Sequence, residues 1–148
     1  IHSFKYRHKI KLGNFLAGLM TDFIREYRLP LTQCDYIIPI PLSLTRLRER
    51  EFNQAQIIAA KISESLQIPL LNNALKRVRH SRPQAELSRE ERLNNLKGAF
   101  AANNKEIING KNILLIDDVL TTGATASEAS RVLKETGANS VFVFTAAG

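Results

Sequence analysis

A pair of acidic residues ends the most apolar stretch of this 148-residue chain. Asp117 and Asp118 directly follow 113–116, four aliphatic residues of the kind that form a strand buried on both faces. In open α/β sheets, ligands bind beyond the carboxyl ends of the strands. Two adjacent carboxylates at that point suit two tasks, which are accepting hydrogen bonds from a diol and binding a hard cation such as Mg²⁺ through water.

A small, hydroxyl-rich stretch follows the acidic pair. Gly123 permits backbone conformations that other residues resist, and its small neighbours let a ligand approach the main chain. Thr125 and Glu128 have capping-box spacing, which predicts a helix start whose unpaired N–H groups suit a phosphate. A ribose 5-phosphate carries a diol and a phosphate at about this separation. The predicted phosphate-binding residues are Thr121, Thr122, Gly123, Ala124 and Thr125.

Two other interpretations fit part of this stretch. It could be a core strand with an incidental acidic tip and a capped helix after it. It could also be the Walker B strand of an ATPase, but that needs a P-loop, and no G-x-x-x-x-G-K followed by Ser or Thr occurs. No G-x-G-x-x-G occurs either, and the three His residues have no spacing with Ser or Asp that suggests a catalytic triad. Hydrolase and metalloprotease functions are therefore not expected.

A first basic cluster follows the apolar segment 36–41. Arg46 and Arg50 could neutralise a diphosphate, because guanidinium groups match phosphate oxygens in pairs. The alternative is a solvated surface on which these arginines pair with Glu49 and Glu51.

A second basic cluster lies in the polar stretch from Arg79 to Lys97, which has no clean apolar period. We expect a mobile loop that closes over substrate and excludes water, or else an ordinary polar excursion. Its candidate ligand-binding residues are Arg79, Arg82, Gln84, Arg89 and Arg92.

Apolar periodicity predicts the elements that position these residues. Strands alternating with helices predict an α/β class, with a mostly parallel twisted sheet flanked by helices in a single domain over 1–148. Helices are expected from residue 12 to a point before Pro30, and over 53–66 and 126–136. Strands are expected over 36–41, 69–71, 74–78, 98–101, 112–116 and 140–145, and a loop or weak helix over 103–111.

The composition fits a soluble globular protein, with 44% hydrophobic and 24% charged residues and no apolar run near the ~20 residues that span a bilayer. A single cysteine, Cys34, excludes an intrachain disulfide and a cysteine-rich zinc site and favours a reducing compartment. No secretory signal is visible, so we expect a cytoplasmic location and no membrane partner. The net charge of +7 favours anionic partners, such as nucleotides, sugar phosphates or nucleic acid.

The stretch from Ile113 to Thr125 closely resembles the motif with which type I phosphoribosyltransferases bind phosphoribosyl pyrophosphate (PRPP). Three more segments, IHSFKYRHK, IPIPLSLTRLREREFNQA and RPQAELSREERLNNLKGAF, resemble the competence-associated ComF family of phosphoribosyltransferase-like proteins. The resemblance covers essentially the whole chain in order. It implies the type I phosphoribosyltransferase fold, with a mobile loop and with PRPP bound across the strand ends.

The resemblance also implies roles for individual residues. Asp117 and Asp118 would hold the ribose 2′- and 3′-hydroxyls, and residues 121–125 would cradle the 5-phosphate. Mg²⁺ would arrive with PRPP and have no direct site of its own beyond those two carboxylates. The loop expected to bind pyrophosphate comprises Pro41, Leu42 and Ser43, followed by Arg46 and Arg50.

Two departures from the family pattern matter. Many members carry an N-terminal cysteine-rich zinc module, which is absent here, so a longer full-length protein is one expectation. Purine-salvage enzymes often have an acid where this chain has Thr121, so the nitrogenous acceptor and the general base stay unknown. Two function classes follow: a Mg²⁺-dependent phosphoribosyltransferase, or a non-catalytic protein that binds PRPP, single-stranded DNA or competence proteins during DNA uptake.

Overall fold

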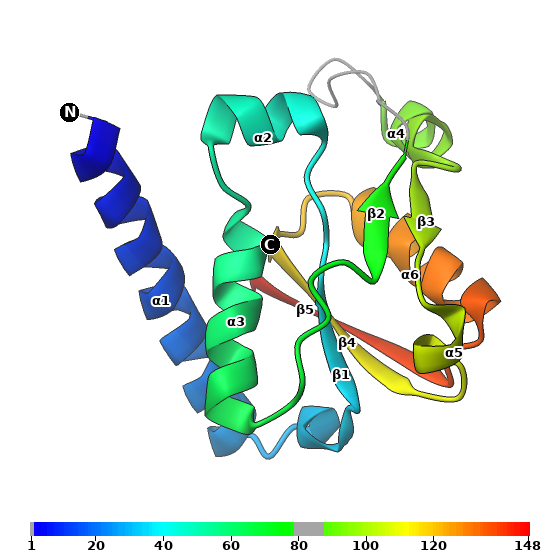
Figure 1. Cartoon of the computed structure of the whole chain (residues 1–148), viewed down its shortest axis with the longest axis horizontal. Coiled ribbons are helices and arrows are strands. Elements are labelled where there is room, and N and C mark those ends of the chain that lie inside the picture. The colour runs from blue at the N-terminus through cyan, green and yellow to red at the C-terminus, as the bar shows by residue number, and fades with distance from the viewer. Residues whose placement is uncertain (1, 79–87) are drawn as a thin grey trace.

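The structure is a computed structural model that describes residues 2–78 and 88–148. Three strands form a parallel sheet in the order β1-β4-β5, and β2 and β3 form a separate antiparallel pair. Figure 1 shows the three-stranded sheet at the centre of the molecule with helices on both of its faces. The predicted α/β arrangement is confirmed, although residues 69–71 form only an isolated bridge between Ile37 and Leu70. The strands are β1 (Tyr36–Pro39), β2 (Leu75–Arg77), β3 (Phe100–Ala102), β4 (Asn112–Val119) and β5 (Ser140–Ala147).

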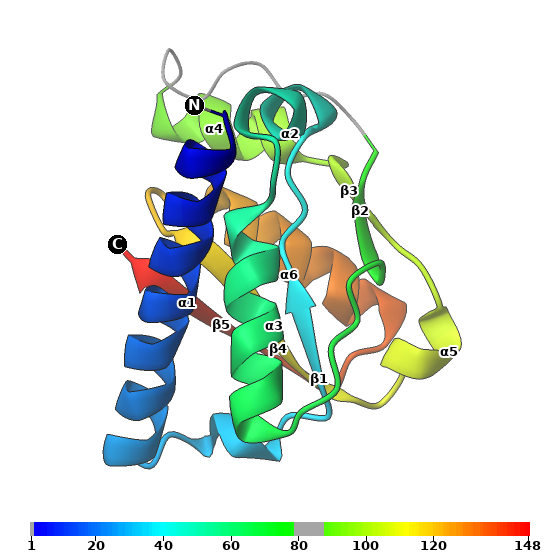
Figure 2. The same cartoon turned by 60° about the vertical axis from the view of Figure 1, so that its left-hand side comes forward.

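Helices α1 and α3 lie side by side on one face of the sheet, and α6 covers the other (Figures 1 and 2). The predicted helices correspond to α1, α3 and α6, but α1 begins ten residues earlier than the apolar period indicates. Helices α2 and α4 were not expected from the sequence. The helices are α1 (His2–Glu26), α2 (Leu44–Arg50), α3 (Gln54–Leu66), α4 (Arg89–Leu96), α5 (Lys105–Ile108) and α6 (Ala124–Thr136), with a 3₁₀ turn, η1 (Pro30–Gln33).

The central strand β4 is buried on both faces, as its apolar sequence predicts. Ile113 and Leu115 pack in the cluster that contains the buried residues of α6. Leu114 and Ile116 alternate with them and pack in the cluster formed with α1 and α3. All four side chains are fully buried. By the same alternation, Asp117 continues the α6 side of the strand and Asp118 the α3 side.

Strand β4 runs past the end of β1. The last register pair between them is Pro39 with Ile116, after which the Ile40 N–H donates to the Ile116 carbonyl at 2.9 Å. Prolines at 39 and 41 cannot donate to a ladder, which explains why β1 stops here. On its other side β4 stays paired with β5 as far as Val119 and Ala147. The acidic pair therefore lies in a strand with one neighbour only, open on the side that β1 has left.

The α1–α3 contact depends on a residue without a side chain. A Cβ at Gly13 would lie 2.7 Å from Ile57 Cγ2 and 2.9 Å from Gln54 Nε2, so the two helices approach at a distance that only glycine permits. Although α1 has 25 residues, no helix in the described part of the chain is long and apolar enough to cross a membrane.

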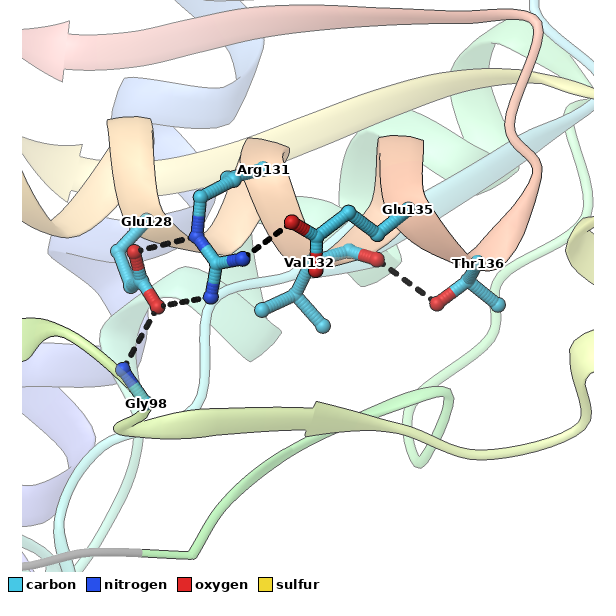
Figure 3. A network of polar contacts seen from close by, with 6 residues as sticks. All are labelled: Gly98, Glu128, Arg131, Val132, Glu135 and Thr136. Carbon is cyan, nitrogen blue, oxygen red and sulfur yellow. Dashed lines mark hydrogen bonds and ion pairs between the residues drawn. The ribbon is translucent and has the colours of Figure 1, made fainter.

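Helix α6 is joined to the segment before β3 by Glu128 (Figure 3). Its Oε1 accepts from the Gly98 N–H at 2.8 Å, and its two oxygens accept from Arg131 at 2.7 and 2.9 Å. The Arg131 hydrogen bonds are the main reason that the pKa of Glu128 lies below its ordinary value. The capping box predicted for Thr125 and Glu128 is therefore wrong, because this carboxylate points to a neighbouring segment instead of its own helix start.

Candidate functional site

Asp117 lies within β4, partly buried and near the start of α6. Its Oδ1 accepts from the Asp118 N–H at 2.9 Å. Burial raises the pKa of this carboxyl from 3.8 to about 7, and the backbone hydrogen bond from Asp118 and the charge of Arg46 oppose that rise. A carboxyl with such a pKa is typical of a functional site rather than a solvated surface.

Asp118 faces helix α2. Its Oδ2 lies 3.4 Å from Nη1 of Arg50. This ion pair spans 68 residues of sequence and brings together a predicted ribose-binding residue and a predicted diphosphate-binding residue. The Arg50 side chain is 50% exposed, and diphosphate binding by the arginines of α2 stays a prediction.

The phosphate-binding stretch forms a small open pocket at the end of β4. Gly123 precedes α6 with a φ of +76°, a conformation that glycine adopts without strain. The helix begins at Ala124, two residues before the predicted start, and Thr122 Oγ1 accepts from the Ala124 N–H at 3.4 Å. The pocket is lined by Asp117, Val119, Leu120, Thr121, Gly123, Ala124, Thr125 and Ala126. The structure thus brings Asp117 and four of the five predicted phosphate-binding residues to one pocket at a helix N-terminus.

The predicted pyrophosphate loop connects β1 to α2. Ser43 caps α2, and its Oγ accepts from the Arg46 N–H at 3.3 Å. Because Arg46 and Arg50 are four residues apart on α2, they lie on the same side of that helix. Both act on the acidic pair, Arg50 through its ion pair with Asp118 and Arg46 through its charge on Asp117.

Asn53 holds this loop in place and was not singled out in the sequence. Its side chain is buried, Nδ2 donates to the Ile40 carbonyl at 2.9 Å, and Oδ1 accepts from the Ala55 N–H at 3.1 Å. One amide therefore caps α3 and fixes the backbone where β1 ends. An Asn immediately before an apolar helical period is a helix-start signal that could have identified the cap, although not the contact with Ile40.

Arg77 is a second residue that the sequence did not identify. It lies opposite Phe100 in the β2–β3 pair, and its guanidinium carbon is 5.5 Å from the centre of that ring. Burial lowers the pKa of Arg77, the charge of Arg46 lowers it further, and the charge of Asp117 opposes both. Arg77 therefore belongs to the charge cluster of the site, and no local sequence signal distinguishes it from other strand arginines.

The polar stretch from Arg79 to Lys97 divides into two parts. Arg79, Arg82 and Gln84 lie outside the described residues. Arg89 and Arg92 belong to α4, so the prediction of an irregular loop is wrong for that part. Ser88 and Glu91 form a capping box: the Ser88 N–H donates to Glu91 Oε2 at 2.7 Å and the Glu91 N–H to Ser88 Oγ at 3.3 Å.

No group of three or more His, Cys, Asp or Glu side chains in the described residues is arranged to hold a metal ion. Asp117 and Asp118 supply carboxylate oxygens, which are the ligands that Mg²⁺ prefers, and two such groups suit a hydrated ion carried by a diphosphate. The Mg²⁺ expectation therefore fits the residues present and stays a prediction.

Comparison with known protein families identifies the domain. Residues 41–147 match the profile of the phosphoribosyl transferase domain. The chain belongs to this family. The matched phosphoribosyltransferase domain begins at Pro41, the first residue of the predicted pyrophosphate loop, and ends within β5.

Relatives confirm the resemblance to the ComF branch of this family. The chain is 37% identical over 149 residues to Competence protein F of Haemophilus influenzae, covering 97% of this chain and 64% of that protein. It is 38% identical over 146 residues to Competence protein ComFC of Bacillus subtilis, covering 96% of this chain and 55% of that protein. It is also 31% identical to DNA utilization protein YhgH of Escherichia coli O157:H7, covering 97% and 63% respectively. The chain thus spans less than two thirds of each relative.

Solved structures confirm the type I phosphoribosyltransferase fold. Glutamine PRPP amidotransferase from B. subtilis, solved with ADP and GMP, superposes with a TM-score of 0.57 at 19% identity over 93% of this chain and 26% of that chain. Purine phosphoribosyltransferase from Pyrococcus horikoshii superposes with a TM-score of 0.53 at 18% identity, covering 93% of this chain and 71% of that chain.

Proposed function

We propose that the chain binds PRPP and transfers its phosphoribosyl group to a nitrogenous acceptor, releasing pyrophosphate. The observation that carries this proposal is the convergence of three groups at one strand end. These are the acidic pair of β4, the pocket at the start of α6, and the arginines of α2. A diol, a 5-phosphate and a diphosphate are the three features of PRPP that such groups recognise.

In this proposal, Asp117 and Asp118 accept hydrogen bonds from the ribose hydroxyls. The N–H groups that open α6 and the hydroxyls of Thr121 and Thr125 donate to the 5-phosphate. Mg²⁺, when bound with PRPP, supplies charge neutralisation for the diphosphate. The bond from C1 to the diphosphate oxygen breaks as a bond from C1 to the acceptor nitrogen forms, through an oxocarbenium-like state. Arg46 and Arg50 stabilise the negative charge that develops on the leaving diphosphate.

The test is a pyrophosphate-release assay with PRPP, Mg²⁺ and a panel of nitrogenous acceptors. Release should depend on one acceptor class and be lost in Asp117→Asn and Asp118→Asn. Glu49→Gln is a matched acid-to-amide control on an exposed position of α2 and should retain the activity. Binding of PRPP without release by any acceptor would refute the transferase and leave a binding protein.

A second candidate is a non-catalytic protein that binds DNA, PRPP or both in support of DNA uptake. The net charge of +7 and the names of the relatives, which refer to competence and DNA utilization, favour it. Binding to phosphate backbones should depend weakly on sequence and fall steeply with salt, because counterions are released.

Charge reversal at Arg79, Arg82 and Arg89 separates the two candidates if both ligands are measured on one variant. Loss of PRPP binding alone supports the transferase, and loss of DNA binding alone supports the binding protein. A cytoplasmic location stays a prediction for either.

A further inference from the structure

Helix α1 carries an exposed apolar stripe that the fold does not use. Leu12, Phe15, Leu19 and Phe23 follow each other at helical spacing and are 53%, 63%, 52% and 46% exposed. The residues that pack against the body of the molecule are different ones, including Ala17, Met20 and Ile24. Figures 1 and 2 show α1 at the outside of the molecule beside α3.

The stripe continues onto the edge of the sheet. The Phe23 ring lies 4.4 Å from that of Tyr27 and 6.3 Å from that of Phe144 on β5, measured between ring centres. Phe142, two residues earlier on the same face of β5, is also exposed. Soluble monomers rarely expose a contiguous apolar patch of more than a few hundred Å², and larger patches mark interaction sites.

Charges beside the stripe indicate which partner fits it. Lys11 lies four residues before Phe15, and Asp22 lies three residues after Leu19. Residues at these spacings are neighbours on a helix surface, so Lys11 borders the stripe near one end and Asp22 borders it near the other. The N-terminal half of α1 contains Lys9 and Lys11, and the C-terminal half contains the acids Asp22 and Glu26. Arg25 also lies in the C-terminal half, where it donates to the Ser65 carbonyl of the same chain at 3.0 Å.

An antiparallel copy of the same helix matches both patterns at one register. If two α1 helices cross antiparallel at the level of Ala17, Phe15 lies opposite Leu19 of the second copy. Leu12 with Phe23, and Lys11 with Asp22, are each one residue, about 1.5 Å, away from exact opposition and still lie within contact reach. Each of these pairs occurs twice by symmetry. A parallel pair would instead oppose like charges. We propose that the chain forms a two-fold symmetric dimer through antiparallel contact of the α1 stripes, with Lys11–Asp22 ion pairs on its flanks.

Sedimentation velocity over about a hundredfold range of concentration tests the proposal, in about 0.15 M salt to screen the net charge of +7. The unaltered chain should show a concentration-dependent equilibrium between one and two copies. Leu19→Glu should be monomeric throughout. Ile107→Glu changes an exposed aliphatic residue on α5, outside the stripe, so it is the matched control and should still dimerise.

A charge swap tests the register. Lys11→Glu should raise the dimer dissociation constant by about tenfold, since two ion pairs become repulsive contacts. Lys11→Glu combined with Asp22→Lys should restore dimerisation. Circular dichroism melts establish that each variant is folded. A single copy at every concentration, open-ended assembly, or failure of the swap to restore the dimer would overturn the proposal. If a different protein or a segment of a longer chain covers the stripe instead, the chain should be a single copy at every concentration.

Discussion

Replacing Asp117 by Asn should stabilise the unliganded protein while removing its ability to bind PRPP. The folded-state pKa of about 7 lies above the ordinary 3.8, so folding disfavours the ionised carboxyl. The folded state is therefore not destabilised by this carboxyl below about pH 4, where it is protonated in both states. Folding stability then falls as the pH rises from about 4 to 7, because ionisation is easier in the unfolded chain. At about 1.4 kcal/mol per pKa unit the full cost at pH 8 is on the order of 2–4 kcal/mol. Asn keeps the oxygen that accepts from the Asp118 N–H and carries no charge.

Thermal and urea unfolding at pH 5 and pH 8 measure this effect. At pH 8 the Asp117→Asn variant should melt roughly 5–15 °C higher than the unaltered chain, and at pH 5 the gain should be less than half as large. Glu49→Gln, which neutralises an exposed acid on α2, is the control, and its stability should change by less than about 0.5 kcal/mol at either pH. Asp118 cannot serve as the control, because its charge contributes to the raised pKa of Asp117. An Asp117→Asn gain that is absent at pH 8, or equal at the two pH values, would refute the burial argument.

Three further predictions concern the scaffold. Glu128→Ala removes the acceptor of the Gly98 N–H and should lower the free energy of unfolding in urea by about 1.5–3 kcal/mol. A change near zero would show that the hydrogen bond between α6 and the segment before β3 is unimportant for stability. Gly18→Ala should raise the melting temperature, because alanine inside a helix is more stable than glycine by up to about 1 kcal/mol and the added Cβ would meet no neighbouring segment within 4 Å. Gly13→Ala should lower it, because the added Cβ would clash with Ile57 and Gln54 of α3. Asn53→Ala should lower the free energy of unfolding by about 2 kcal/mol, because the cap of α3 and the hydrogen bond to the Ile40 carbonyl are both lost. It should also weaken PRPP binding measured by calorimetry. Unaltered PRPP affinity would argue against a role of Asn53 in holding the pyrophosphate loop.

The centre of the site could be predicted because its signals are local. An apolar run, two acids and a glycine among threonines are contiguous in sequence, and each has a physical meaning without reference to other segments. The burial of 113–116 and a helix start close behind Gly123 follow from that stretch. The predicted strand end at Ile116 is wrong, because β4 stays paired with β5 through Asp117 and as far as Val119.

The remainder of the site depends on pairing between distant segments. Arg77 reaches the site because β2 pairs with β3, which sets it opposite Phe100 across 23 residues of sequence. The ion pair of Arg50 with Asp118 likewise requires that α2 sit over the end of β4. No spacing rule contains this information.

Helix α4 was not expected from the sequence because little of it is apolar. Leu96 is fully buried, while the exposed Glu90, Glu91 and Asn94 remove any clear apolar period. The capping box of Ser88 and Glu91 was the available signal for this helix. The opposite error occurred at Thr125 and Glu128, where the same spacing predicted a cap that Glu128 does not form.

The most direct test of the central claim is calorimetric titration of PRPP into the chain with and without Mg²⁺. We expect saturable binding of one PRPP per chain, tighter with Mg²⁺ and lost when Asp117→Asn and Asp118→Asn are combined. Absence of binding at millimolar PRPP with Mg²⁺, or undiminished binding by the folded double variant, would contradict it.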